Sequence, residues 1–419
     1  MLSVEDALER VLSFFSVLEP ENKPILESQG QVLSEDVIAN VNVPSTDNSA
    51  MDGYAISTDS IRGASKNTPV KLQVIGSISA GQIPQKPVSQ GTAIRIMTGA
   101  SIPMGADAVI QFEDTDEIGR KESGETLSEI RIFNDIEKFT NIRPAGQDFK
   151  NGDLILKKGT IIKPAAIGLL ASTGCSQVNV IRKPKVSILA TGNELIEPTS
   201  EHSLGKTYDS NSYSLTASVM NSGAIVNPLG IAMDDMKSIG KKLKEGLSSD
   251  MIISSAGVSK GDYDMVKDVL MKYGKIDFWS VKMRPAKPIA FGILKNDISK
   301  PVPFLGLPGN PVSALVAFEQ FGRAAISKMM GKNSFKRPTI KAKIQDRIDN
   351  IDGRRVYARV IVTKKDGEYY AHLTGNQSSN LLTSMAHANG LAICPEDMTS
   401  KQPGEMVDVL MIDWPEWVF

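Results

Sequence analysis

The chain has 419 residues, a length that predicts roughly two to four domains rather than one hydrophobic core. With 41% hydrophobic residues, 23% charged residues and a formal net charge of -1, its composition is that of a globular protein and argues against a general nucleic-acid or membrane binder. Its two cysteines, Cys175 and Cys394, form no paired motif, so neither a disulfide framework nor a zinc–thiolate site is expected. The absence of a signal-peptide pattern and of a membrane-length apolar run predicts a cytoplasmic protein.

The first predicted element is an amphipathic helix over residues 3–18. Ser3 is suited to cap it, and Pro20 is expected to end it. One face of this helix carries the apolar residues Val4, Ala7, Leu8, Val11, Phe15 and Leu18. Such a face needs a partner, either within the chain or in a second subunit.

From about residue 41 the pattern changes to short β-type runs separated by glycine and proline. These runs cover residues 70–75, 92–97, 108–112 and 130–133. Regularly spaced short strands indicate a small β-rich domain or barrel. Residues 145–182 combine a hairpin-like piece with a short helix and could return to the first domain, which would make the β-rich part an insertion.

Residues 185–330 alternate strands and helices, which predicts βαβ units and a mostly parallel sheet. Ligands of such sheets bind outside the carboxyl ends of the strands. Residues 334–419 are again β-rich, with a hairpin turn at Lys365-Asp366-Gly367, and indicate a separate C-terminal β domain.

Two polar segments follow strands of the predicted α/β domain. In the first, Gly192 permits a tight turn and Glu194 lies at the carboxyl edge of the sheet, although a simple helix cap would read the same way. The second covers residues 255–264, whose small residues allow backbone N–H groups to approach an anion. Within it, Asp262 and Asp264 suit either magnesium ligation or a favourable interaction with a helix dipole.

Two further segments suit an anionic ligand. Residues 307–313 read as a strand, a glycine turn and a helix start that can hold a phosphate, with Asn310 as a plausible N-cap, and they match neither a Walker loop nor G-x-G-x-x-G. Residues 282–288 hold three cations in a proline-stiffened stretch, which either face water or are held toward an anion. The three histidines form no metal-ligand pair, and no G-x-S-x-G elbow indicates a serine hydrolase.

Taken together, these segments resemble the molybdopterin molybdenumtransferase family, which includes the E domain of gephyrin. The resemblance spans nearly the whole chain in one order. The matching segments are Pro44–Ala55, Arg95–Ala100, Arg143–Gly146, Thr191–Leu195, Gly257–Asp264, Arg284–Pro288, Leu307–Ser313 and, more weakly, Ser384–Gly390.

The resemblance implies a multidomain α/β plus β protein. Its expected parts are a helical-β linker domain (1–43 and 144–182), an inserted β-rich domain (44–143), a parallel-sheet α/β molybdopterin-binding domain (183–333) and a C-terminal β barrel (334–419). It also implies a homodimer with the active cleft between subunits, which would explain the N-terminal helix. The upstream adenylyltransferase is a candidate partner, whereas nucleic acid and membrane are not expected.

The implied reaction converts adenylylated molybdopterin and molybdate into the molybdenum cofactor and AMP. Asp52, Thr98, Glu194 and Asp264 would be catalytic, with Asp52 and Thr98 supplied by the partner subunit, and Glu194, Asp262 and Asp264 would bind Mg²⁺. The implied substrate-binding residues are Gly192, Asp235, Ser255, Gly257, Ser259, Arg284, Lys287, Pro308, Gly309, Asn310 and Ser313. A divalent cation between carboxylates and a pyrophosphate would replace repulsion by attraction.

The chain departs from the family pattern at three positions. Ala256 and Ala286 stand where glycine is usual, which would reduce the room for the backbone if φ is positive there, and Lys260 adds a cation to the small-residue loop. The competing functions are the preceding adenylyltransferase step, a non-catalytic scaffold of the gephyrin E type and a nucleotide-binding regulator. The presence of the flanking β domains and of the acidic and basic residues favours molybdenum insertion.

Overall fold

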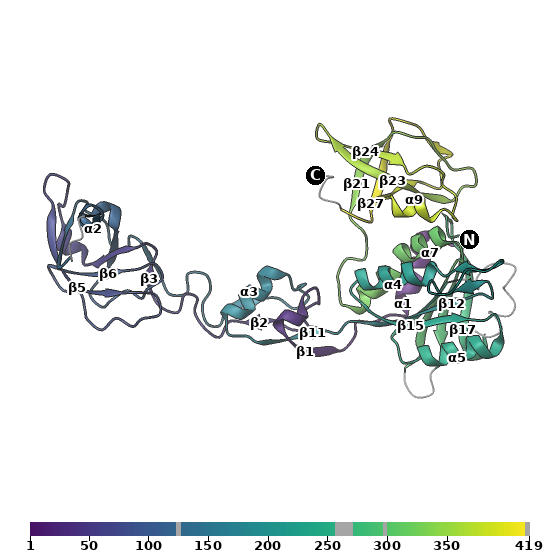
Figure 1. Cartoon of the computed structure of the whole chain (residues 1–419), viewed down its shortest axis with the longest axis horizontal. Coiled ribbons are helices and arrows are strands. Elements are labelled where there is room, and N and C mark those ends of the chain that lie inside the picture. Colours follow the sequence, from purple (N-terminus) through teal and green to yellow (C-terminus); the bar gives the residue numbers. More distant parts are fainter. Residues whose placement is uncertain (123–126, 256–270, 296–299, 415–419) are drawn as a thin grey trace. The chain divides into compact units, whose positions relative to one another are not determined.

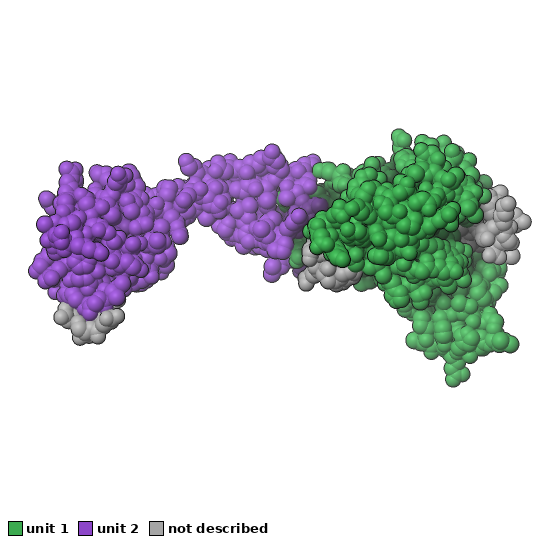
Figure 2. Space-filling model, turned by 90° about the horizontal axis from the view of Figure 1, so that it is seen from above, with its two compact units in different colours: residues 1–23, 28–34, 179–419 green, residues 24–27, 35–178 purple. Residues whose placement is uncertain are grey.

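The structure is a computed structural model that describes residues 1–122, 127–255, 271–295 and 300–414. The chain divides into two compact units, which Figure 2 shows in different colours. Unit 1 contains residues 1–23, 28–34 and 179–419, and unit 2 contains residues 24–27 and 35–178. No helix among the described residues is long and apolar enough to cross a membrane.

A six-stranded sheet forms the centre of the α/β part of unit 1 (Figure 1). Its strand order is β15 (Ile225–Ala232), β12 (Lys185–Thr191), β16 (Met251–Ser255), β20 (Val302–Leu307), β19 (Pro288–Leu294) and β17 (Gly274–Ser280). The first four strands run parallel to one another, and β19 pairs antiparallel with both β20 and β17. The predicted mostly parallel sheet is confirmed, and its central strands are apolar because both of their faces are buried.

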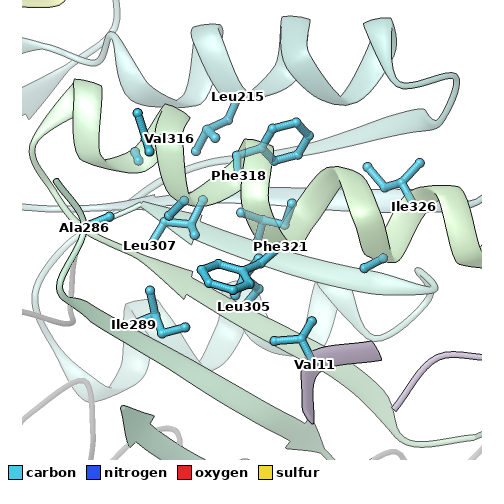
Figure 3. Packing of buried hydrophobic residues seen from close by; sticks show 14 of the residues in the cluster. Val11, Leu215, Ala286, Ile289, Leu305, Leu307, Val316, Phe318, Phe321 and Ile326 are labelled. Carbon is cyan, nitrogen blue, oxygen red and sulfur yellow. The ribbon is translucent and has the colours of Figure 1, made fainter. Parts of the chain in front are cut away.

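Helices cover both faces of this sheet. They are α4 (Asn211–Asn221), α5 (Met236–Gly246), α7 (Pro311–Ala317), the π-helical turn η4 (Phe318–Gly322) and α8 (Arg323–Met329). Neighbouring residues of β20 show the two faces, since Leu305 packs with Phe318 and Phe321 whereas Phe304 packs with residues of α5. Figure 3 shows the first of these clusters.

The N-terminal helix α1 (Val4–Ser13) packs on the α/β part of its own chain. Ser3 caps it as predicted, because its Oγ accepts a hydrogen bond from the Asp6 N–H at 3.0 Å. The helix ends at Ser13 rather than near residue 18. Val11 is fully buried in the cluster that contains Leu305 and Phe321 (Figure 3). The apolar face is therefore covered within the chain and does not require a second subunit.

The C-terminal part of unit 1 is a closed barrel. Its strands are β21 (Thr339–Ile344), β23 (Arg355–Lys365), β24 (Glu368–Leu373), β25 (Gly390–Cys394) and β27 (Met406–Met411), and pairing of β23 with both β24 and β25 closes the ring. The predicted hairpin turn is present, with Asp366 and Gly367 at φ of 50° and 82°. The short strand β18 (Met283–Arg284) pairs with the start of β23 and links the barrel to the α/β part, and the short helix α9 (Leu382–Ala386) precedes β25.

Unit 2 contains a five-stranded sheet and a smaller helical-β part. The sheet order is β7 (Ala108–Gln111), β4 (Gly53–Ile56), β6 (Thr92–Ile96), β5 (Val70–Ile78) and β8 (Glu129–Ile132), which confirms the β-rich region. The smaller part contains α3 (Pro164–Ser172) and the pair β2 (Val37–Ile38) and β10 (Leu154–Leu156). The remaining strands in the described chain are β1 (Pro20–Pro24), β3 (Asn48–Ser49), β9 (Ile142–Arg143), β11 (Gln177–Ile181), β13 (Leu195–Ile196), β14 (Thr207–Tyr208), β22 (Ile348–Asp349) and β26 (Ser400–Lys401), and α2 (Glu117–Glu122) is a short helix.

Candidate functional site

The turn after β12 presents a free carboxylate. Gly192 has φ of 154°, and a Cβ added there would lie 2.7 Å from Glu194 Oε2, so only glycine leaves room for the glutamate to fold back over the turn. Glu194 is exposed, and its side chain makes no hydrogen bond or ion pair with the described residues. An unpaired carboxylate at the carboxyl end of a parallel strand is well placed to bind a cation.

The turn after the neighbouring strand β15 is fixed by its own hydrogen bonds. Asp235 caps α5, since its Oδ1 accepts from the N–H groups of Lys237 and Ser238 at 2.9 and 2.8 Å. Asp234 Oδ2 accepts from the Asn193 N–H, and Asn193 Oδ1 accepts from the Asp234 N–H, both at 3.1 Å. Asp235 therefore has a structural role as the cap of α5, and its substrate-binding role stays a prediction.

The turn after β20 reaches the barrel. Pro308 is buried, whereas Gly309 and Asn310 are exposed. Asn310 occupies the N-cap position of α7 as predicted, but its side chain makes no capping hydrogen bond among the described residues. Its Nδ2 instead donates to Ser379 Oγ at 3.1 Å, and the Val312 N–H donates to the Ser379 carbonyl at 3.2 Å. One of the first-turn N–H groups expected for a phosphate is therefore occupied by the barrel.

Three side-chain oxygens near these strand ends are buried and have no hydrogen-bond partner within the described part of the chain. They are Ser255 Oγ at the end of β16, and Asn211 Oδ1 and Ser212 Oγ at the start of α4. Asn211 Nδ2 donates to the Gly309 carbonyl at 2.7 Å, so this residue is held beside the turn after β20. Buried polar atoms are normally satisfied, and unsatisfied ones at the edge of a sheet suit contact with a ligand.

A cavity of about 400 Å³ lies between the α/β part and the barrel. The α/β side contributes Arg284, Pro285, Ala286 and Ser313, and the barrel side contributes Arg354, Val356, Tyr357, Arg359, Asn376, Gln377 and Ser379. Both sides belong to unit 1. Of the predicted substrate-binding residues, the cavity brings together Arg284 and Ser313.

Positive charge in this cavity exceeds negative charge. Arg354 is paired with Asp352, whereas Arg284 donates to the Asp349 carbonyl at 2.9 Å and has no carboxylate partner among the described residues. Arg359 is 1% exposed, and among the described residues its guanidinium donates to Ser384 Oγ at 3.2 Å and to the Ser378 carbonyl at 3.1 Å.

Burial and the nearby Arg284 charge lower the pKa of Arg359 to about 10. Two guanidinium groups without carboxylate partners among the described residues suit an anion, because a buried charge is costly until it is compensated.

In unit 2, Asp52 and Thr98 lie side by side. Gly53 pairs with Ile96 in antiparallel strands. Asp52, just before Gly53, and Thr98, two residues after Ile96, therefore lie at the same end of this strand pair. Asp52 Oδ1 accepts hydrogen bonds from the Thr98 N–H at 2.7 Å and from Thr98 Oγ1 at 2.9 Å. These two bonds hold the pKa of Asp52 below its usual value. Both residues are exposed, so the pair forms an ionised, preorganised acceptor at the surface of unit 2.

Comparison with known proteins identifies the family. The MoeA N-terminal region (domain I and II) matches residues 2–174, the probable molybdopterin binding domain matches 187–328, and the MoeA C-terminal region (domain IV) matches 341–412. The chain belongs to the molybdopterin molybdenumtransferase family. Molybdopterin molybdenumtransferase 2 of Mycobacterium tuberculosis is 35% identical, with 98% of this chain and 99% of that protein covered.

Other molybdenumtransferase relatives agree over the same length. The molybdopterin molybdenumtransferase of Haemophilus influenzae is 33% identical, with 98% of both chains covered. The solved structure of the molybdopterin biosynthesis MoeA protein from Pyrococcus horikosii superposes with a TM-score of 0.82 at 30% identity, covering 99% of this chain and 100% of that chain. The multidomain fold expected from the sequence is thereby confirmed.

One departure from the molybdenumtransferase pattern has a clear structural effect. Ala286 has φ of 73°, the left-handed region in which glycine is usual, and this conformation costs an alanine about 1–2 kcal/mol. Its methyl group is buried in the unit 1 core, which returns about 0.8 kcal/mol. The burial therefore offsets the strain only in part. Lys287, the next residue, is exposed and does not line the cavity.

Several predicted residues of the molybdenumtransferase site lie outside the described residues. They are Gly257, Ser259, Asp262 and Asp264, together with the departures Ala256 and Lys260. Of the implied magnesium ligands, Glu194 alone is described. Within the described part of the chain, no group of three or more histidine, cysteine, aspartate or glutamate side chains could hold a metal ion.

The barrel residues of the anion site were missed by the sequence analysis. Arg359 lies in β23, where the residues around it, from Val356 to Val362, are almost all apolar. An arginine in such an apolar run indicates a buried charge, which often has a functional role. Ser384, which contacts Arg359, falls in the weakest of the matched segments. Nothing in the sequence indicated that this strand would face the turn after β20.

Proposed function

We propose that this chain inserts molybdenum from molybdate into adenylylated molybdopterin and releases AMP. The observation that carries the proposal is the cavity in which Arg284 and Arg359 have no carboxylate partner among the described residues. Molybdate is a dianion and the nucleotide substrate carries a pyrophosphate, so both need cationic partners. Relatives named molybdopterin molybdenumtransferase cover 98% of the chain, which supports the same reaction here rather than the preceding adenylylation.

The two guanidinium groups and Ser313 would hold the oxygens of molybdate. Arg359 is buried and cannot turn toward bulk water, so its charge is held in the cavity before the anion arrives. Such preorganised charge stabilises a bound anion without the cost of reorganising solvent. Lys287 is placed outside this cavity and would contact a more distant phosphate oxygen of the substrate.

The carboxylates would hold a magnesium ion. Glu194 fits this role because its exposed carboxylate has no partner among the described residues and offers the hard oxygen ligands that Mg²⁺ prefers. Asp262 and Asp264 would complete the set. When bound, the ion would neutralise carboxylate and pyrophosphate together and stabilise charge on the leaving AMP.

A cytoplasmic homodimer would complete the site. Asp52 and Thr98 belong to unit 2, whereas Glu194 and Arg359 belong to unit 1. Asp52 and Thr98 of one subunit would enter the cleft of the other, where the ionised Asp52 could orient a substrate hydroxyl, amine or metal-bound water. The upstream adenylyltransferase is the expected source of the adenylylated substrate.

The decisive experiment is AMP release from adenylylated molybdopterin, measured with and without molybdate and Mg²⁺. Release that requires both supports the proposal. Glu194→Ala should lose release by at least about a hundredfold, whereas the matched control Glu197→Ala, three residues away, should keep it. No release by folded protein that binds the substrate would overturn the enzyme assignment in favour of a scaffold or regulator.

A further inference from the structure

The loop of residues 374–380 links the barrel to the α/β part of unit 1. It runs between β24 and α9 and has the sequence Thr-Gly-Asn-Gln-Ser-Ser-Asn. The pairing of β24 with β23 starts at Val360, and the Thr374 N–H just after β24 donates to the Arg359 carbonyl at 3.1 Å. Among the described residues, the Arg359 N–H has no backbone acceptor in β24. The loop supplies the acceptor for this N–H.

Gln377 makes the central contact of this loop. Its side-chain Oε1 accepts a hydrogen bond from the Arg359 N–H at 2.8 Å, and its Nε2 donates to the Arg359 carbonyl at 3.2 Å. The same Nε2 donates to the Gly375 carbonyl at 3.0 Å, which closes the loop on itself. Gln377 thus accepts from the Arg359 N–H and shares the Arg359 carbonyl with Thr374, whose N–H and Oγ1 donate to it at 3.1 and 3.3 Å.

The rest of the loop fixes the direction of the guanidinium. The Ser378 carbonyl accepts from Arg359 Nη2 at 3.1 Å. Ser379, the next residue, accepts from Asn310 Nδ2 and from the Val312 N–H of the α/β part. The loop therefore bonds to Arg359 on one side and to the turn after β20 on the other, and it sets the distance between them.

We propose that Gln377 is a positioning residue for the oxyanion: by holding the backbone of Arg359, it sets where the guanidinium lies in the cavity and so sets the affinity for molybdate. The inference rests on the proposed function. A tetrahedral dianion needs donors at fixed separations, and displacement of one donor by about 1 Å is enough to weaken a preorganised site. Gln377 itself need not touch the anion for this effect.

The test uses Gln377→Met in the full chain. Methionine has a similar length but neither accepts from nor donates to the Arg359 backbone in a normal hydrogen bond. The matched control is Gln345→Met, since Gln345 lies in the same barrel, is also half-buried, and has a side chain that bonds only to the Lys343 carbonyl away from the cavity. Thermal unfolding of both variants monitors the fold.

Two measurements separate this inference from the function on which it rests. Direct titration with sodium molybdate should show binding roughly tenfold weaker for Gln377→Met, because the Arg359 guanidinium is no longer held in place, and unchanged for Gln345→Met. In AMP release, the KM for molybdate should rise by a similar factor while kcat changes little.

Each outcome decides a different point. Molybdate binding by the wild type without turnover would overturn the proposed function and leave the positioning role standing. Equal molybdate binding by folded wild type and Gln377→Met would overturn the positioning role, as would failure of the wild type to bind molybdate at all. A parallel loss in Gln345→Met would also overturn it, because the effect would then be a general weakening of the barrel.

Discussion

At the level of single residues, Arg359 is a charge inside the barrel wall. Its guanidinium donates to Ser384 and Ser378 and meets no carboxylate among the described residues. Burial of such a charge costs free energy, and the nearby Arg284 adds repulsion. Folding alone does not explain this arginine, whereas an anionic ligand does.

Replacement of this charge should therefore separate stability from function. Arg359→Met fills a similar volume without charge, so the free energy of unfolding at pH 8 should stay the same or rise by about 1 kcal/mol. Molybdate-dependent AMP release should be lost. Chemical denaturation and the AMP assay measure the two effects, and a loss of stability of several kcal/mol would show that the arginine is needed for the fold.

The same variant makes a prediction about pH. The pKa of Arg359 is lowered to about 10 in the folded protein, below its usual value, so the unfolded state binds more protons above that pH. Wild-type stability should rise relative to Arg359→Met as the pH passes through about 10, because the neutral guanidine no longer carries the burial cost. A difference in unfolding free energy that stays constant between pH 8 and about 11 would contradict the lowered pKa.

Thr98 controls the charge of Asp52 through two hydrogen bonds, of which the backbone bond is the stronger influence and the hydroxyl bond the second. Thr98→Val removes the hydroxyl bond, so the pKa of Asp52 should rise, while Thr98→Ser should keep it low. The stability that ionised Asp52 contributes at neutral pH should then be lost at a higher pH on acidification. NMR titration of the Asp52 carboxyl carbon measures this, and an unchanged pKa in Thr98→Val would assign the shift to the backbone bond alone.

At the level of elements, hydrophobic pattern predicted the central strands because both of their faces are buried. Strands β12, β16 and β20 are short apolar runs, and they pair in parallel within the sheet that the sequence predicted for residues 185–330. The end of α1 was predicted too late, since Phe15 and Leu18 continue the helical spacing and contribute to the same core after the helix has ended. Beyond Ser13 the apolar spacing reflects burial of these side chains in the core rather than continued helical hydrogen bonding of the backbone.

The position of α1 gives a prediction at this scale. Val11 is fully buried in the core of its own chain, so Val11→Ala should lower the free energy of unfolding by about 2 kcal/mol through two lost methyl groups and the cavity left behind. Oligomeric state, measured by light scattering, should not change. The control Glu9→Ala changes an exposed position of the same helix and should alter stability by less than about 0.5 kcal/mol. Dissociation without destabilisation would instead place this face at a subunit interface.

The barrel contribution to the site could not be predicted from local pattern. The closure of the barrel depends on pairing between β23 and β25, strands separated by 24 residues of sequence between Lys365 and Gly390, and on the loop that carries Gln377. Such contacts are long-range and leave no periodic signal. Residues of the α/β turns were predicted because strand ends and glycines mark them, and Arg284 and Ser313 do line the cavity.

At the level of the whole molecule, the proposed site is divided between the two units. Asp52 and Thr98 lie in unit 2, and Glu194 and Arg359 lie in unit 1. The sequence orders these residues along the chain but does not determine whether one chain or two supply them to a single cleft. The proposed homodimer takes them from two chains, and this proposal can be tested without any structure of the complex.

Subunit mixing gives that test. Asp52→Ala and Glu194→Ala should each be inactive as pure proteins. If each cleft takes unit 1 from one subunit and unit 2 from the other, a mixed dimer contains one intact cleft and one cleft with both substitutions. Random reassociation of equal amounts makes half of the dimers mixed, so AMP release should return to about one quarter of the wild-type rate.

The control for subunit mixing is a pair that cannot complement. Glu194→Ala mixed with Arg359→Met should remain inactive, because both changes lie in unit 1 and every cleft then carries one of them. No recovery in the first mixture, with exchange of subunits shown by a tagged chain, would mean that one chain supplies both parts of its own cleft. Recovery would establish that unit 2 acts in the partner subunit, since no other arrangement yields an intact set of residues from two defective chains.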